Sequence, residues 1–188
     1  LFIVFSFAIR TSSFQTFLAN QIASNLSNKL NATVAIKNVY LVLPGELAIE
    51  DFILTDTNKD TLFFLDKTYI SFNNYNIPKI SIDLNSISLE GGYIHIKRDK
   101  NAKFNYAFLK HYFFNKKRKK KNPIIKIDKL NLKNITFKYD DYRKKKRNYG
   151  VDYFHLKTKG INGEVENFKY YNGLYYGDIK TLNLKEKS

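Results

Sequence analysis

Residues 82–96 have the sequence IDLNSISLEGGYIHI, in which apolar and polar side chains alternate on both sides of a Gly91-Gly92 step. Successive side chains of a strand point to opposite faces of a sheet, so this pattern predicts one apolar and one polar face. Residues 127–137, IDKLNLKNITF, repeat the pattern, and residues 36–41 are a looser third copy. Repeated short strands with such corners predict a solenoid-like or curved antiparallel sheet.

The same alternation continues through most of residues 33–188. The chain contains 14 Tyr and 16 Phe among many Ile, Thr and Val residues, a composition that favours strands. Hydrophobic residues make up 44% of the sequence, enough for a substantial core or a long apolar face. We therefore expect a mainly β fold in which residues 33–188 form a groove-like or taco-shaped sheet.

Residues 12–32 predict an amphipathic helix instead. Ser12 or Ser13 is the expected N-cap. The apolar stripe expected to pack on the rest of the domain recurs every four residues: Phe14, Leu18, Ile22, Leu26 and Leu30.

Residues 1–9, LFIVFSFAI, are apolar and are followed by Arg10. Nine helical residues rise about 14 Å, less than the roughly 30 Å hydrocarbon core of a bilayer. Two interpretations fit: the end of a membrane anchor helix, or an interior strand or helix of a soluble domain. The chain lacks Met and starts at Leu1, which favours the first. Residues 1–11 are therefore expected to be the end of a truncated anchor helix.

The formal charge of +15 is concentrated in two runs, residues 116–121 and 143–147. Without those eleven residues the net charge falls to +4. We expect the runs to lie in loops at 115–123 and 142–149, available to an anionic partner or simply solvated. The candidate anion-binding residues are Lys116, Lys117, Arg118, Lys119, Lys120, Lys121, Arg143, Lys144, Lys145, Lys146 and Arg147.

Asp56-x-Asn58-x-Asp60 matches the first half of a calcium-binding loop. The second half fails, because Thr61 stands where the loop requires Gly and Lys67 stands where it requires Glu. A hairpin turn rich in Asp and Asn is the favoured interpretation.

No constellation of residues in the sequence points to catalysis, to a metal or to a cofactor, and we expect the protein not to be an enzyme. The chain has no Cys, which excludes disulfides and thiolate sites. Its three His residues lie far apart in the sequence. The adjacent carboxylates Asp140 and Asp141 border the second basic run and are expected to neutralise neighbouring Lys and Arg side chains.

Five stretches carry a family resemblance: residues 14–19, 26–36, 47–54, 60–65 and 87–96. Together with the apolar start, they resemble the N-terminal region of TamB-type proteins of the AsmA-like group, over roughly residues 1–140. The long basic runs depart from that pattern.

This resemblance implies a single-pass inner-membrane protein whose body lies in the periplasm as a rolled sheet with an apolar lining. It also implies a role in outer-membrane biogenesis, through phospholipid transport or the assembly of outer-membrane proteins. The expected partners are phospholipid and an outer-membrane barrel protein of the Omp85 type. The family supplies neither catalytic residues nor a cofactor.

The alternating strands supply candidates for the lining of such a groove, since lipid tails need a continuous apolar surface. An ordinary closed core remains the alternative for the same side chains. Two other functions stay open, a soluble nucleic-acid binder that uses the basic loops and a structural β-domain that binds no lipid. The groove candidates are Ile82, Leu84, Ile87, Leu89, Ile94, Ile96, Ile127, Leu130, Leu132, Ile135 and Phe137.

Overall fold

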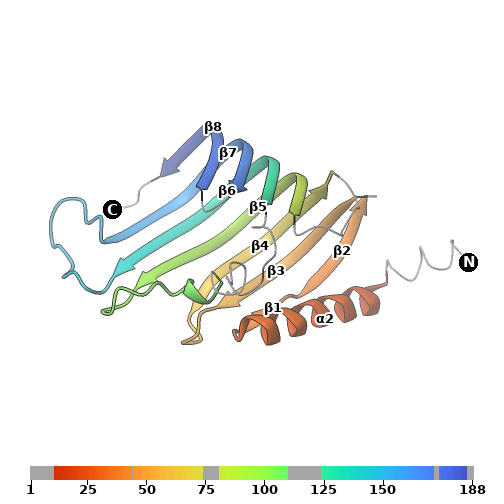
Figure 1. Ribbon diagram of the computed structural model, residues 1–188, viewed down its shortest axis with the longest axis horizontal. Coiled ribbons are helices and arrows are strands. Elements are labelled where there is room, and N and C mark those ends of the chain that lie inside the picture. The colour runs from red at the N-terminus through yellow and green to blue at the C-terminus, as the bar shows by residue number, and fades with distance from the viewer. Residues whose placement is uncertain (1–10, 44, 74–80, 110–123, 172–173, 186–188) are drawn as a thin grey trace, which may run out of the picture.

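The computed structural model describes residues 11–43, 45–73, 81–109, 124–171 and 174–185 (Figure 1). Its main feature is a curved open sheet of eight strands, with one long helix at one edge. The mainly β prediction is therefore confirmed. The elements are α2 (Ser12–Leu30), β1 (Val34–Ala35), β2 (Asn38–Leu43), β3 (Glu46–Thr55), β4 (Thr61–Phe72), β5 (Ser81–Arg98), β6 (Ile124–Asp141), β7 (His155–Tyr171) and β8 (Leu174–Lys185).

The strands follow the order β1-β3-β4-β5-β6-β7-β8, and β2 also pairs with β3. All pairs are antiparallel except β5 and β6, which run parallel. The prediction of a wholly antiparallel sheet was therefore wrong at this pair. A parallel pair needs a crossover, because the chain must return to the end of the sheet where the first strand began. The connection between Arg98 and Ile124 provides it.

The strands are longer than expected, with 18 residues in each of β5 and β6. The Gly91-Gly92 step, which the sequence suggested as a corner between short strands, lies inside β5, and Asn134 lies at the matching place inside β6. Gly91 and Asn134 adopt left-handed backbone conformations, with φ of 61° and 53°. Asp51 in β3 and Gly160 in β7 do the same, at 49° and 62°. The pairing of the strands places these residues in or beside one row across the sheet.

A left-handed residue within a strand bends the strand and shifts the alternation of its side chains by one position. The ladders of β3, β4, β5 and β6 pass this row without a register shift, whereas β6 and β7 shift register there. Apolar residues three apart can then stay on the same face. Leu132 and Ile135 flank such a corner, and Leu89 and Gly92 flank the matching corner on β5. The row of corners therefore bends the sheet without interrupting its apolar face.

The two similar sequence stretches lie side by side in the sheet. Leu89 pairs with Leu132 and Ile94 pairs with Phe137, so β5 and β6 present matching positions in parallel register. The sequence similarity thus corresponds to two neighbouring strands with the same faces and the same corner.

Helix α2 begins at Ser12, the first residue of the predicted range, but its N-cap is Thr11 and not Ser12 or Ser13. The Phe14 amide donates to the Thr11 hydroxyl over 3.4 Å. The helix packs on β1 and β2 and ends at Asn31, in a left-handed conformation. The buried residues of the core between helix and sheet are Ala19, Ala23, Leu30, Val34, Ile36, Val39, Leu54 and Leu62.

The expected anchor segment lies almost entirely outside the described residues, which begin at Thr11. Among the helices of the described part, none combines the length and the apolar character needed to cross a bilayer.

Candidate functional site

Mostly apolar residues of β4 to β7 lie opposite one another and form rows across one face of the sheet, and the residues in these rows without a large apolar side chain are Thr68, Gly92, Thr158 and Gly163. Because paired residues on neighbouring strands point to the same side, each row is a continuous strip. We call these rows the apolar face. Its four rows are Ile70–Ile87–Leu130–Val165, Thr68–Leu89–Leu132–Gly163, Leu65–Gly92–Ile135–Ile161 and Phe63–Ile94–Phe137–Thr158.

The predicted groove residues fall on these rows or continue them along β5 and β6. Ile135 is the most buried, with 1% of its surface exposed, and Leu84 and Ile127 are also buried. Seven others are half-buried: Ile87, Leu89, Ile94, Ile96, Leu130, Leu132 and Phe137. The side chain of Ile82 lies outside the described residues, although its backbone pairs with Ile125 in the ladder of β5 and β6.

The opposite face of the sheet carries charged pairs. Lys133 Nζ lies 2.6 Å from Glu90 Oε1, and Lys129 Nζ lies 3.0 Å from Glu164 Oε2. Exposed ion pairs of this kind contribute little to stability, typically under about 1 kcal/mol each. These pairs identify the side of the sheet that meets water.

Two described segments pack on the sheet, one beside the strands that precede the apolar face and one at β4 and β5. Helix α2 packs on β1 and β2, at one edge of the sheet. Residues 104–109 bring Tyr106 and Phe108 onto the core beside Phe63 and Ile96. Both covering segments therefore lie at or before β5 in the strand order.

An apolar cavity of about 230 Å³ opens between the first turns of α2 and the sheet. It is smaller than the roughly 300–1,000 Å³ of typical ligand pockets. By size alone it fits a short stretch of hydrocarbon better than a whole ligand. Its lining residues are Phe14, Leu18, Val39, Tyr40, Leu41 and Leu47.

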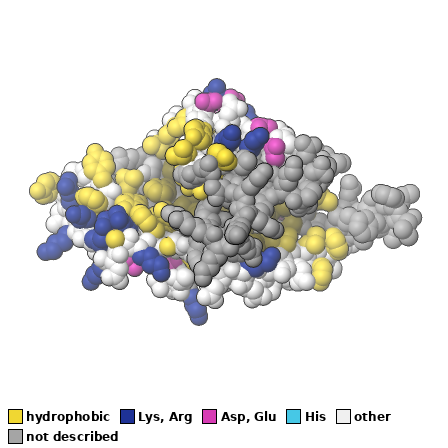
Figure 2. All heavy atoms as spheres, in the orientation of Figure 1, with side chains coloured by type: hydrophobic (Ala, Val, Ile, Leu, Met, Phe, Trp, Pro, Cys, Tyr) yellow, Lys and Arg dark blue, Asp and Glu magenta, His cyan; other side chains and the backbone are white. Residues whose placement is uncertain are grey.

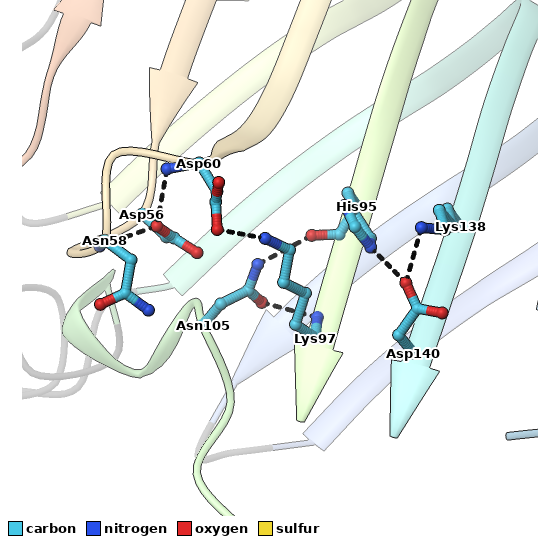
Figure 3. A network of polar contacts seen from close by, with 8 residues as sticks. All are labelled: Asp56, Asn58, Asp60, His95, Lys97, Asn105, Lys138 and Asp140. Carbon is cyan, nitrogen blue, oxygen red and sulfur yellow. Dashed lines mark hydrogen bonds and ion pairs between the residues drawn. The ribbon is translucent and has the colours of Figure 1, made fainter. Parts of the chain in front are cut away.

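A polar network joins the ends of β5 and β6 (Figure 3). Asp140 Oδ2 lies 2.7 Å from His95 Nε2 and 2.8 Å from Lys138 Nζ. The Asn105 amide donates to the His95 carbonyl and accepts from the Lys97 amide, over 2.8 and 2.9 Å. Sequence reasoning missed this network because its members lie up to 45 residues apart. Through Asn105, this network attaches the connection between β5 and β6 to β5. We call it the clamp and assign it a structural role.

The two adjacent carboxylates pair with cations, as predicted. Asp140 binds Lys138, and Asp141 binds the Arg143 guanidinium through both oxygens, at 2.9 and 2.6 Å. These bonds outweigh the effect of burial and hold the pKa of Asp141 well below its usual range. Both carboxylates are therefore held in ion pairs.

The Asp56 segment is a hairpin turn, as predicted. Asp56 Oδ1 accepts hydrogen bonds from the amides of Asn58 and Asp60, at 2.8 and 3.0 Å. Asp99 makes the same two bonds, to the amides of Asn101 and Lys103. Within the described ranges, no group of three or more His, Asp or Glu side chains is placed to hold a metal ion.

Protonation of His95 is expected to make the free energy of unfolding depend on pH. Burial lowers the pKa of His95, and nearby Lys138 and Lys97 lower it further, against the opposing effect of Asp140. The unfolded chain therefore binds this proton more readily, and the free energy of unfolding should fall as pH drops below about 6.5. We expect the urea midpoint to decrease between pH 7.5 and pH 5.5.

The control for this prediction is His95→Gln, which keeps a hydrogen-bond donor but does not titrate. It should flatten the pH dependence in that interval. The pKa of Asp140 is also lowered, because hydrogen bonds from Lys138 and His95 outweigh burial. Protonation of Asp140 therefore lowers the free energy of unfolding only below a pH of about 4. It does not contribute to the change expected between pH 7.5 and pH 5.5. An unchanged slope in His95→Gln would show that other groups cause the effect.

Of the two basic runs, residues 116–121 lie outside the described residues. The second run lies in the connection between β6 and β7, where Arg143 is bound to Asp141 and Lys144 lies over the Phe154 ring. Two exposed aromatic residues follow this run and precede β7, which begins at His155. Tyr149 and Tyr153 are 87% and 71% exposed.

Comparison with models of known protein families, with characterised proteins and with solved structures gave no match. The resemblance to TamB-type proteins therefore receives no support from a relative and stays a prediction.

Proposed function

We propose that this protein handles lipids in a bacterial envelope and holds acyl chains against its apolar face. The observation that carries the proposal is the alignment of apolar residues on β4 to β7, many of them only half-buried. The charged pairs on the other side of the sheet favour an arrangement in which one face meets water and the other meets hydrocarbon.

The chemistry of a sheet suits this task. Hydrogen bonds between strands satisfy the backbone amides and carbonyls, so one face can be wholly apolar without exposing unpaired polar groups. Burying a methylene of an acyl chain on such a surface stabilises the complex by about 0.8 kcal/mol. Ten methylenes would contribute about 8 kcal/mol, which offsets the loss of translational and rotational freedom on binding.

Residues 1–11, in this proposal, tether the chain to the inner membrane and leave the body in the periplasm. The protein then takes part in phospholipid transport or in the assembly of outer-membrane proteins, with a barrel protein of the Omp85 type as partner. These parts of the proposal rest on the sequence resemblance.

Native mass spectrometry of the full chain, purified from membranes in mild detergent, tests the binding step. We expect a mass shift that corresponds to bound phospholipid and disappears on delipidation. Folded protein that repeatedly lacks bound lipid, even after incubation with phospholipid, would contradict the proposal.

A further inference from the structure

We propose that the connection between β6 and β7, residues 142–154, docks the molecule on an anionic lipid surface. We call this segment the β6–β7 loop. The proposal goes beyond the binding of acyl chains by the apolar face, because it concerns lipid headgroups and different residues.

Four consecutive cations of the loop are exposed: Lys144, Lys145, Lys146 and Arg147. Among the described residues, none of their side chains lies within 4 Å of a carboxylate, whereas neighbouring Arg143 is bound to Asp141. Each basic side chain close to an anionic membrane strengthens its attraction to the protein. Four such residues therefore provide a substantial attraction that salt will weaken.

Aromatic and aliphatic side chains follow these cations at alternate positions. Tyr149, Val151 and Tyr153 are 87%, 47% and 71% exposed. Large apolar side chains gathered on an exposed loop point to an interaction surface. Tyr is enriched where membranes meet water, because its ring is apolar and its hydroxyl remains hydrated.

The loop is held in place at its base. Asp152 accepts hydrogen bonds from the amides of Arg147 and Phe154, at 2.8 and 3.0 Å, and lies 3.0 Å from His155 Nδ1. At the other end, Asp141 binds Arg143. These contacts fix both ends of the loop, so less ordering is needed when it binds.

The loop lies at one extremity of the molecule. In Figure 1 it forms the left-hand end, opposite the start of α2. Figure 2, in the same orientation, shows basic and hydrophobic side chains next to one another at this end. A broad planar surface can therefore approach the loop along the long axis of the molecule.

Lipid fits these features better than nucleic acid does. Proteins that bind single strands spread cations along a groove and stack successive bases on aromatic rings. Here the cations are confined to one loop, and the exposed Val151 between the two Tyr side chains offers no ring for stacking. An interface that receives apolar side chains beside its phosphates accommodates both sets of residues.

Co-sedimentation of the full chain with phosphatidylcholine vesicles, prepared with and without phosphatidylglycerol, tests the proposal. We expect stronger binding to the anionic vesicles. The difference between the two preparations isolates the contribution of the headgroups from apolar insertion elsewhere. Replacing Lys144, Lys145, Lys146 and Arg147 by Gln should reduce that difference at least about tenfold.

Two further variants make the test specific. Tyr149→Ser with Tyr153→Ser should weaken binding to both vesicle types, whereas neutralising Lys116 to Lys121 should leave the contribution of the β6–β7 loop in place. Circular dichroism confirms that each variant is folded. The lipid seen by native mass spectrometry should be unchanged in the loop variants, which separates this proposal from the proposed function.

Three results would overturn the proposal. The first is anionic-vesicle binding that survives both loop variants, and the second is binding that depends only on residues 116–121. The third is duplex DNA that binds through the loop cations while anionic vesicles do not bind.

Discussion

Ile135→Ala is expected to lower the free energy of unfolding by about 2–5 kcal/mol. Ile135 has 1% of its surface exposed and lies between Gly92 and Ile161 in the middle of the sheet. Truncation removes three buried carbon atoms, and the hydrogen-bonded strands on either side relax only partly into the resulting cavity. Urea denaturation followed by circular dichroism measures the effect.

Thr136→Ala is the matched control, since it changes the next residue, which is half-buried and points to the other face. We expect it to cost no more than about 1 kcal/mol. If both variants lose the same free energy of unfolding, Ile135 and Thr136 do not lie on faces that differ in burial, which contradicts the structure.

Leu130→Gln with Leu132→Gln is expected to reduce the binding of phospholipid by at least about tenfold while the chain remains folded. Both side chains are half-buried on adjacent rows of the apolar face. Burying one such side chain is worth about 1.5–3 kcal/mol, and each 1.4 kcal/mol corresponds to a factor of ten in affinity. Titration with a fluorescent phospholipid measures the loss.

The control for this pair is Lys129→Gln with Asn131→Gln, which places the same side chains at alternate positions on the charged face. This variant removes the Lys129–Glu164 ion pair but should bind lipid within about twofold of the unmodified chain, because a surface ion pair contributes little. If both double variants lose binding equally, the lipid does not lie on the apolar face.

The type of secondary structure could be predicted from the sequence more readily than the path of the chain. The period of two in residues 82–96 predicted strands with one polar face, and the four-residue period of Phe14 to Leu30 predicted the helix. The direction of pairing was not predictable in the same way. Alternation has the same appearance in parallel and antiparallel strands, so the parallel pairing of β5 and β6 was missed.

The corners show a second limit. The Gly91-Gly92 step was correctly recognised as a break in alternation but wrongly taken to end a strand, and Asn134 was not singled out. Gly and Asn readily adopt left-handed backbone conformations, which suit either a turn or a bend within a strand. Only the neighbouring strands decide between the two, and here they continue past both residues.

The candidate site was predictable as a set of residues but not as an arrangement. Leu89 and Leu132 were both named as lining residues, yet their pairing across β5 and β6 depends on the register of a parallel pair. The clamp between His95 and Asp140 depends on that same register. Contacts that join distant segments leave no local pattern in the sequence.

Photo-crosslinking at adjacent residues of β6 tests the central claim most directly. Benzoylphenylalanine replaces either Leu132, on the apolar face, or Asn131, on the charged face, and the full chain is irradiated in phospholipid. The account predicts lipid adducts at position 132 and few or none at position 131. Equal labelling at both positions, or labelling at 131 alone, would contradict it.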